Sequence, residues 1–264
     1  MTESTRPLIL LTNDDGVSAP GLAALHRALA ALFDVQVLAP EHNWSASGHS
    51  KTMHKPLRVT EASLIDGSPA LALSGSPSDC VAVALLGLLP RKPDLVISGI
   101  NQGANVGHDL TYSGTVSAAM EAVIGGVSAI ALSLDSYEWR VFDDAAALAR
   151  ILALQLVQTQ VQPPLLLNVN VPARPLAEIK GMRITRQGTR IYRDALIQRQ
   201  DPRGRAYYWI GGDPPDGLPE AGTDIGALAE GYVSITPLML DLTDREAISL
   251  LQAWDLHLPT SEGA

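Results

Sequence analysis

The chain has 264 residues, of which 46% are hydrophobic and 18% are charged, so it can bury a sizeable core and is not disordered as a whole. Its net charge of −9 has the wrong sign for a protein that binds duplex nucleic acid without sequence preference. The single cysteine, Cys80, excludes an intrachain disulfide and a metal site made of cysteines alone.

The first residues lack the basic segment and the apolar run of a secretory signal. The longest apolar stretch, residues 81–89, is less than half as long as a membrane span. We therefore expect a cytoplasmic protein with no membrane partner and no duplex nucleic-acid partner.

Strand and helix patterns alternate through the first two thirds of the chain. Apolar runs predict strands at residues 8–11, 35–38, 71–73, 95–97, 129–134 and 165–171. Leucines spaced by three and four residues predict a helix from Pro20 to Leu32. Further helices are expected from Ser76, as the N-cap, to Leu89, around residues 116–124 and at residues 143–158. This order predicts a single α/β domain over residues 1–264, with a Rossmann-like, mostly parallel sheet and helices on both faces.

The chain changes character in a predicted extension at residues 181–235. Residues 180–205 hold eight Lys or Arg and two Asp, a local charge of +6, and surround a turn at residues 201–204. This pattern favours a solvated, basic β-hairpin arm; the alternative is an arm that reaches over an anionic ligand or an acidic neighbouring subunit. A lone hairpin is not stable in water, so we expect it to serve in oligomerisation. Thr243 as N-cap and Glu246 at the third helical position predict a C-terminal helix at residues 243–256.

Asp14 and Asp15 follow the first predicted strand. Two adjacent carboxylates repel each other unless a cation lies between them, and Mg²⁺ or Mn²⁺ takes oxygen ligands. Ser45 follows the second strand and offers a neutral oxygen at the same sheet edge. The simpler interpretations are an Asp-Gly turn and an ordinary Ser/Gly loop.

Neutral polar groups follow two further strands. Asn101 and Asn105 lie in a Gly/Asn-rich loop that matches neither a dinucleotide nor a Walker A motif. Ser113, Gly114 and Thr115 start a helix, where hydroxyl and N–H groups bind anions, although an N-cap alone explains a serine there. Because all of these groups follow strands, one crevice would gather them, and a metal beside an anion site indicates metal-assisted phosphate chemistry.

At this point the sequence resembles the SurE family, the survival protein E nucleotidases. The resemblance runs from about residue 8 to residue 240. It rests on Asn-Asp-Asp-Gly at residues 13–16, Ala-Pro-Gly at 19–21, Val-Leu-Ala-Pro at 37–40, Gly-Ser-Pro-Ser-Asp-Cys at 75–80, Ser-Gly-Ile-Asn at 98–101, Tyr-Ser-Gly-Thr-Val at 112–116, Asn-Val-Asn-Val-Pro at 168–172 and Gly-Tyr-Val-Ser-Ile-Thr-Pro-Leu at 231–238.

The resemblance implies a metal-dependent enzyme that hydrolyses nucleoside 5′-monophosphates, and in some members 3′-monophosphates or short polyphosphate, to nucleoside and phosphate. It implies a homodimer or homotetramer with exchanged C-terminal elements. The ligands of a divalent cation, Mn²⁺ or Mg²⁺, would be Asp14, Asp15, Ser45 and Asn101, and the phosphate would be held by Asn105, Ser113, Gly114 and Thr115. Trp44 departs from the polar or basic residue expected there, and Ser47 competes with Ser45 as the ligand.

The role of Asp14 stays open at this stage: it is a metal ligand, a general base or a nucleophile. Two rival interpretations remain beside the nucleotidase. One is a phosphatase of broad specificity that forms an aspartyl-phosphate, and the other is a catalytically silent nucleotide-binding module. The adjacent acids do not fit the Asp-x-Asp of haloacid dehalogenase-type phosphatases. A response-regulator receiver has an acid pair after its first strand, but it also needs an Asp after the third strand and a Lys after the fifth, and it is much shorter than this chain.

Overall fold

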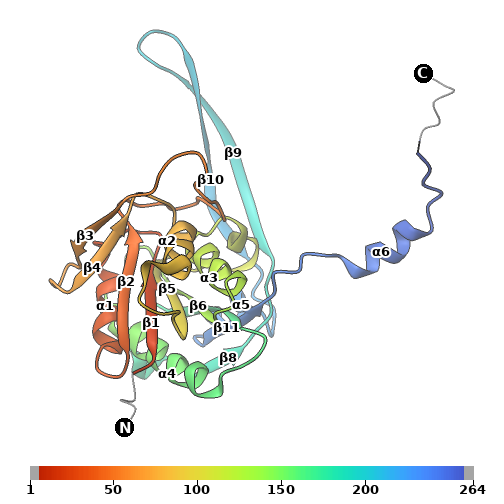
Figure 1. Cartoon of the computed structure of the whole chain (residues 1–264). Coiled ribbons are helices and arrows are strands. Elements are labelled where there is room, and N and C mark those ends of the chain that lie inside the picture. The colour runs from red at the N-terminus through yellow and green to blue at the C-terminus, as the bar shows by residue number, and fades with distance from the viewer. Residues whose placement is uncertain (1–5, 259–264) are drawn as a thin grey trace.

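The protein is described by a computed structural model that covers residues 6–258. Within these residues nine strands form one sheet in the order β3-β4-β2-β1-β5-β6-β7-β11-β8, and β9 pairs with β10 apart from it (Figure 1). The strands from β4 to β7 in this order run parallel, whereas β3 and β11 run antiparallel to their neighbours β4 and β7. The strands of the large sheet are β1 (Leu8–Thr12), β2 (Asp34–Pro40), β3 (Val59–Ser63), β4 (Pro69–Leu73), β5 (Leu95–Gln102), β6 (Ala129–Asp135), β7 (Leu166–Pro172), β8 (Met182–Ile184) and β11 (Val233–Leu238).

Helices cover both faces of the sheet because successive strand residues point to opposite sides. Ile9 and Leu11 of β1 pack in one core cluster with residues of α1 and α4, whereas Leu8 and Leu10 pack in a second cluster with residues of α2 and α3. The helices and helical turns are α1 (Pro20–Leu29), α2 (Pro77–Val83), η1 (Ala84–Leu88), η2 (Gly107–Thr111), α3 (Gly114–Ile124), α4 (Asp143–Thr159), η3 (Leu176–Glu178), α5 (Asp224–Ala229) and α6 (Arg245–Gln252). The predicted fold class is confirmed.

The strand order reverses between β1 and β5. The chain moves outward from β1 to β2 and β4, and then returns to place β5 on the other side of β1. In open α/β sheets such a switch point leaves a crevice outside the carboxyl ends of the two strands. The loops that follow β1, β2 and β5 meet at this edge.

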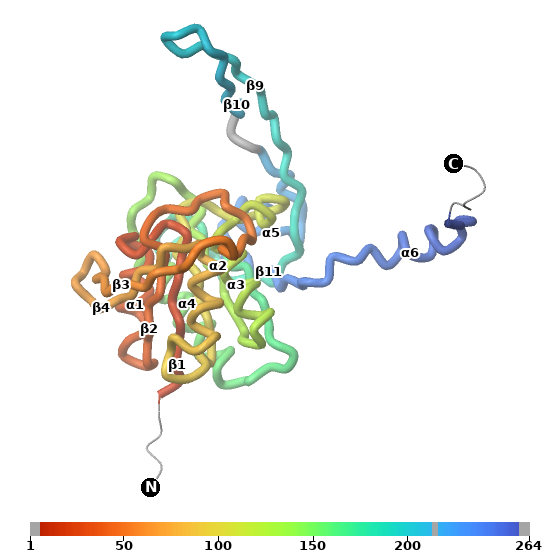
Figure 2. Tube along the Cα trace, turned by 45° about the horizontal axis from the view of Figure 1, so that its top comes forward, coloured from red at the N-terminus to blue at the C-terminus, as the bar shows by residue number. Residues whose placement is uncertain are grey.

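A long hairpin leaves the domain between β8 and β11. It consists of β9 (Arg190–Gln200) and β10 (Ala206–Gly217), joined by the predicted turn near Asp201. The hairpin and α6 both project away from the sheet, and they separate from each other in both views (Figures 1 and 2). No residue of α6 is buried. None of the helices in residues 6–258 has the length and apolar character needed to cross a bilayer.

Several local predictions need correction. The first helix ends at Leu29 rather than Leu32, and Leu32 is exposed. The helix after Ser76 ends at Val83 and continues only as a short π-helical turn. Strand β3 was not predicted, and β5 extends to Gln102, so Asn101 lies in a strand rather than a loop. Asp244, and not Thr243, is the N-cap of α6, because its carboxylate accepts the Glu246 and Ala247 N–H groups.

A further correction concerns the charge of the arm. Lys180, Arg183 and Arg186 lie before the hairpin, and the return strand adds two aspartates. Residues 190–217 therefore hold five arginines and four aspartates, a net charge of 5 − 4 = +1. The projecting arm is almost neutral, and its surface instead exposes apolar side chains such as Leu196, Trp209 and Ile210.

Candidate active site

A polar cleft of about 260 Å³ opens at the switch point. Residues from the loops after β1 and β2, from β5, from the segment around η2 and from the first residue of β9 line it. The lining residues are Asp14, Ser45, Ala46, Asn101, Gln102, Ala104, Asn105, Asp109, Tyr112, Ser113, Tyr137 and Arg190. Five of the eight predicted site residues are thus gathered here: Asp14, Ser45, Asn101, Asn105 and Ser113.

The turn after β1 leaves both aspartate side chains available. Asn13 holds the turn by donating to the Gly16 carbonyl at 2.9 Å and accepting the Gly16 N–H at 3.1 Å. Gly16 has a φ of +98°, a conformation that favours glycine. Asp14 and Asp15 are the two central residues of this turn, and neither of their carboxylates takes part in the hydrogen bonds between Asn13 and Gly16.

Asp14 lies at the floor of the cleft and is only 3% exposed. The Thr115 hydroxyl donates to its Oδ1 at 2.6 Å, and an added Cβ at Gly114 would come within 3.0 Å of its Oδ2. Burial raises the pKa of Asp14, although the hydrogen bonds from Thr115 oppose this. The carboxyl group therefore sits against the first turn of α3 in surroundings that disfavour its charge unless a cation is bound.

Asp15 faces an adjoining hollow rather than the cleft itself. This hollow is lined also by Ser18, Asn43 and Gln102, and Gln102 belongs to both walls. Burial and the neighbouring Asp14 charge raise the pKa of Asp15 to about 6, while an Asn43 amide 3.2 Å away partly opposes the shift. The two acids are adjacent in sequence, but the structure directs them to neighbouring cavities.

The loop after β2 brings Ser45, and not Ser47, to the cleft. Trp44 donates its main-chain N–H to the Asp14 carbonyl at 2.7 Å, which fixes the loop beside the turn after β1. Ser45 is exposed and lines the cleft, whereas the Ser47 hydroxyl is buried without a partner among the described residues and does not line it. The structure thus favours Ser45 between the two candidates, and Trp44 contributes main chain at this point.

The donor set around Asp14 fits a hard divalent cation. The Asn101 amide nitrogen donates to the Gly103 carbonyl at 2.8 Å, so its amide oxygen has no hydrogen-bond donor among residues 6–258. No group of three His, Cys, Asp or Glu residues in that part of the chain is placed to hold a metal. A cation here would depend on carboxylate, hydroxyl and amide oxygens, which Mg²⁺ and Mn²⁺ accept and a zinc site does not favour.

Of the three phosphate-binding residues predicted at the start of α3, only one lines the cleft. Ser113 is the N-cap: its hydroxyl accepts the Val116 N–H at 3.1 Å and lines the cleft. Gly114 and Thr115 do not line the cleft, because Asp14 covers them and engages the Thr115 hydroxyl. The binding of phosphate by these three residues stays a prediction. Thr115 could contribute only its main-chain N–H, because its hydroxyl is bound to Asp14.

Asn105 is held rigidly at the cleft wall. Its N–H donates to Asn170 Oδ1 at 2.8 Å, and its carbonyl accepts from the amides of Asn168 and Asn170. Its side-chain NH₂ group donates to the Ser133 hydroxyl at 2.8 Å, and this hydroxyl is equally able to donate to the oxygen of a flipped Asn105 amide. Both orientations of the Asn105 amide therefore preserve this contact, and one of them turns the NH₂ group towards the cleft.

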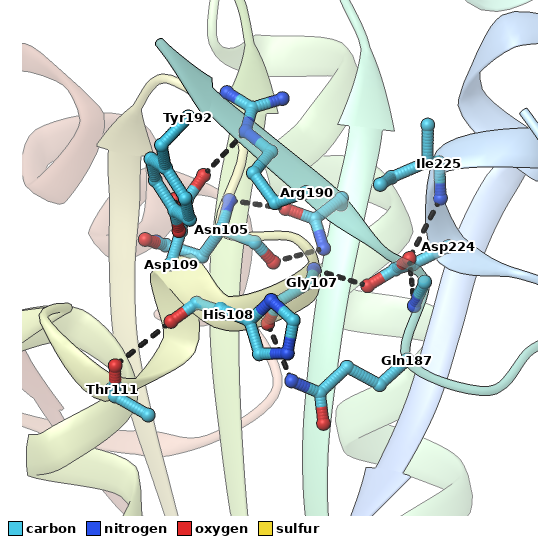
Figure 3. Close-up of polar contacts among 12 residues, drawn as sticks. Asn105, Gly107, His108, Asp109, Thr111, Gln187, Arg190, Tyr192, Asp224 and Ile225 are labelled. Carbon is cyan, nitrogen blue, oxygen red and sulfur yellow. Dashed lines mark hydrogen bonds and ion pairs between the residues drawn. The ribbon is translucent and has the colours of Figure 1, made fainter. Parts of the chain in front are cut away.

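Seven cleft residues were not among the predicted site residues: Ala46, Gln102, Ala104, Asp109, Tyr112, Tyr137 and Arg190. Tyr112 and Tyr137 are 61% and 75% exposed at its mouth, and Asp109 and Arg190 form an ion pair at its wall (Figure 3). Arg190 belonged to the predicted arm, and nothing local in the sequence indicated that the arm begins inside the cleft.

The comparisons with known proteins agree on one family. The sequence profile described as Survival protein SurE matches residues 9–194. Proteins named 5′-nucleotidase SurE are 55% identical over 245 residues in Herpetosiphon aurantiacus and 50% identical over 250 residues in Chloroflexus aggregans. These matches cover 92% and 94% of this chain and 96% and 98% of the relatives. The crystal structure of the SurE protein from Aquifex aeolicus is similar with a TM-score of 0.79 at 40% identity, covering 93% of this chain and 100% of that chain.

The sheet with a polar cleft at its switch point defines an α/β protein of the class that binds ligands at the carboxyl ends of its strands. Within that class, the chain belongs to the SurE family, because the profile matches more than half of it and the relatives are similar over nearly its full length. The resemblance seen in the sequence motifs is confirmed.

Proposed function

We propose that this protein is a divalent-metal-dependent phosphomonoesterase that hydrolyses nucleoside 5′-monophosphates to nucleoside and phosphate. One observation carries the proposal: Asp14, Ser45, Asn101, Asn105 and Ser113 line the same cleft, in a chain whose relatives are named 5′-nucleotidases. The proposal extends to nucleoside 3′-monophosphates and short polyphosphate, because their hydrolysis would use the same phosphate chemistry at the same site. The cytoplasmic location also stays a prediction.

Asp14, Ser45 and Asn101 would hold the cation, with Asp15 contributing from the adjoining hollow. A bound Mn²⁺ or Mg²⁺ would neutralise phosphoryl oxygens and make a water molecule more acidic. Thr115 would keep Asp14 ionised and fixed in orientation through its 2.6 Å hydrogen bond. The contact with Gly114 restricts the carboxyl group further, which favours Asp14 as a ligand of fixed geometry over a nucleophile that must reach the phosphorus.

The phosphate would lie between the start of α3 and Asn105. Ser113 and the main-chain N–H groups of Gly114 and Thr115 would donate to its oxygens, and the Asn105 amide would donate from the opposite wall. The network of Asn168, Asn170 and Ser133 keeps Asn105 in place, so little reorganisation is needed when the substrate binds.

The decisive assay is release of inorganic phosphate from nucleoside 5′-monophosphates with added Mn²⁺ or Mg²⁺. Chelation should abolish turnover, and either metal should restore it. Asp14→Asn should lose nearly all turnover while staying folded, because Asp14 faces the cleft and not the apolar core. Asp34→Asn, at the opposite end of the sheet, is the matched control and should keep wild-type activity.

Other outcomes of this assay would identify the rival functions. Full activity in a rigorously metal-free preparation would refute metal dependence. A trapped acyl-phosphate on Asp14 would identify the broad-specificity phosphatase, and nucleotide binding without turnover at any metal would identify the silent binding module.

We propose that the arm and α6 mediate assembly into a homodimer or homotetramer. The support is their exposed apolar surface, since Trp209 and Ile210 on the arm and Leu250 and Trp254 at α6 are 57–83% exposed. Such a surface on projecting elements is typical of an interface, and exchange between copies would cover it.

A shortened arm tests this assembly. Asp194 pairs with Gly212 across the hairpin, so residues 195–211 can be replaced by an Asn-Gly turn without disturbing the root of the arm. We expect the mass measured by light scattering to fall. A folded variant with unchanged oligomeric mass would show that the arm does not mediate assembly.

A further inference from the structure

Arg190 is the only cationic side chain that lines the cleft among residues 6–258. It is the first residue of β9, and its side chain is only 20% exposed, although most of the hairpin that follows is exposed. Arginine is rarely buried without a charged partner, and Arg190 has two acidic neighbours: Asp109, with which it forms an ion pair, and Asp135, whose raised pKa the Arg190 charge partly opposes. Its four-fifths buried side chain is therefore held in a defined position at the root of an exposed arm.

Asp109 fixes the orientation of this guanidinium. Arg190 Nε lies 3.0 Å from Asp109 Oδ2, off the N–H direction, so the contact is an ion pair rather than an aligned hydrogen bond. The Tyr192 hydroxyl donates to the other oxygen of Asp109 at 2.6 Å. Neither terminal nitrogen of Arg190 has a hydrogen-bond acceptor in the described part of the chain, and the two nitrogens point away from Asp109 (Figure 3).

The main chain beneath Arg190 is fixed as well. Gln187 donates its amide to the Gly107 carbonyl at 2.7 Å. The buried Asp224 carboxylate accepts the N–H groups of Gly107 and Gly188 at 3.0 and 2.8 Å (Figure 3). An added Cβ at Gly107 would lie 3.1 Å from the main-chain nitrogen of Arg190, which shows how closely the two segments pack. Arg190 therefore occupies the cleft wall as a preorganised group and not as a mobile surface side chain.

The charges of the cleft indicate which ligand the Arg190 guanidinium would bind. Asp14 and Asp109 line the cleft and Asp15 lies next to it, so an entering phosphate dianion meets negative charge from the protein. A guanidinium presents two parallel donors that match two oxygens of a phosphate, and it is held here with those donors unpaired. We infer that Arg190 is a substrate-binding residue whose two terminal nitrogens bind the phosphate group, with Asp109 as its positioning residue; this inference rests on the proposed function.

The alternative is that Arg190 only clamps the arm to the domain through Asp109. Tyr192 also ties the arm to the domain, because its hydroxyl donates to the same Asp109 carboxylate, but it does not line the cleft. Tyr192→Phe is therefore the matched control: it weakens the clamp and leaves the guanidinium in the cleft.

The experiment measures the dissociation constant of inorganic phosphate by calorimetry, in the presence of Mn²⁺, for the full-length wild type and three variants. Arg190→Met should weaken phosphate binding about 10- to 100-fold, the loss expected for a hydrogen bond between charged groups. The phosphate affinity of Arg190→Lys should fall between those of wild type and Arg190→Met, because the lysine ammonium is a point charge and lacks the two parallel donors of the planar guanidinium. Tyr192→Phe should stay within about twofold of wild type. The Michaelis constant for nucleoside monophosphate should follow the same order.

Wild-type phosphate affinity in Arg190→Met, or an equal loss in Tyr192→Phe, would overturn the inference in favour of a clamp. Unchanged affinity in Arg190→Lys would overturn two-point binding, and this variant decides the question if Arg190→Met does not fold. Calorimetry needs no turnover, so an inactive wild type would refute the proposed function while the phosphate affinities still decide the role of Arg190.

Discussion

The contact between Gly114 and Asp14 gives a prediction that separates activity from stability. An alanine Cβ at position 114 would lie 2.7 Å from Asp14 Cβ, whereas ordinary contact begins at 3.4 Å. The carboxyl group or the start of α3 must then move by about 0.7 Å (3.4 − 2.7). The atom concerned is Cβ, which is bonded to the main chain of a residue that is only 3% exposed, so rotation of a flexible side-chain end cannot relieve the contact.

We expect Gly114→Ala to lower kcat/KM about 10- to 100-fold, because displacement of a catalytic group by about 1 Å costs about 100-fold in rate. The free energy of unfolding should change by no more than about 2 kcal/mol, since overpacking of about 1–3 kcal/mol is partly offset by the better helix propensity of alanine, about 1 kcal/mol. Phosphate-release kinetics and urea unfolding measure the two effects.

Gly125→Ala, at the other end of α3, is the control. Its added Cβ would clash with a terminal methyl of Leu85, which is the flexible end of a side chain, and would make ordinary contact with the carbonyl oxygens of Ala122 and Glu121. All of these atoms lie far from the cleft along the helix, so activity should be retained. Wild-type kcat/KM in folded Gly114→Ala would refute the argument that the position of Asp14 determines turnover.

Three further predictions concern the acids. Thr115→Val should cost about 1–3 kcal/mol in the free energy of unfolding and weaken Mn²⁺ binding, because Asp14 loses its buried donor, whereas Thr115→Ser should bind Mn²⁺ as wild type does. Burial and the Asp14 charge raise the pKa of Asp15 to about 6, and burial raises the pKa of Asp14 as well, so Mn²⁺ affinity should fall by at least about tenfold per pH unit below pH 6; a flat titration would contradict this. Burial alone would raise the pKa of Asp79, but hydrogen bonds from Thr52 and from Ser76 at the start of α2 lower it. Asp79→Asn should therefore destabilise the fold at pH 7. The difference seen in urea unfolding should shrink as the pH falls below about 4, because Asp79 is protonated first in the unfolded chain and, at lower pH, in the native state.

The sequence predicted the strands that are buried on both faces, because continuous apolar runs closed by turn residues have few other interpretations. It also predicted Ser76 as the N-cap of α2, and the structure has a capping box of Ser76 and Asp79 there. Strand β3 escaped prediction because Val59–Ser63 is a mostly exposed edge strand, and its sequence Val-Thr-Glu-Ala-Ser has no apolar run. Tertiary pairing with β4, and not local preference, makes it a strand.

The candidate site was predictable where its residues follow strands of the parallel sheet. Asp14, Asn101 and Ser113 share an edge because parallel strands end together, and topology alone brings them close. Arg190 enters from a segment more than 70 residues after Ser113, through a hairpin whose limits the sequence did not define. The same uncertainty about limits produced the overestimate of the arm's positive charge.

The position of the hairpin between β8 and β11 has a consequence for how the protein can vary. Both ends of the arm leave and return at one side of the domain, so its tip at residues 201–205 is joined to the rest only through its own ladder. Insertions, deletions or a fused reporter at the tip should leave the sheet intact, whereas a shift of one residue at the root would carry Arg190 out of the cleft. The length of the hairpin can therefore vary at its tip, whereas the register at its root, where Arg190 enters the cleft, cannot.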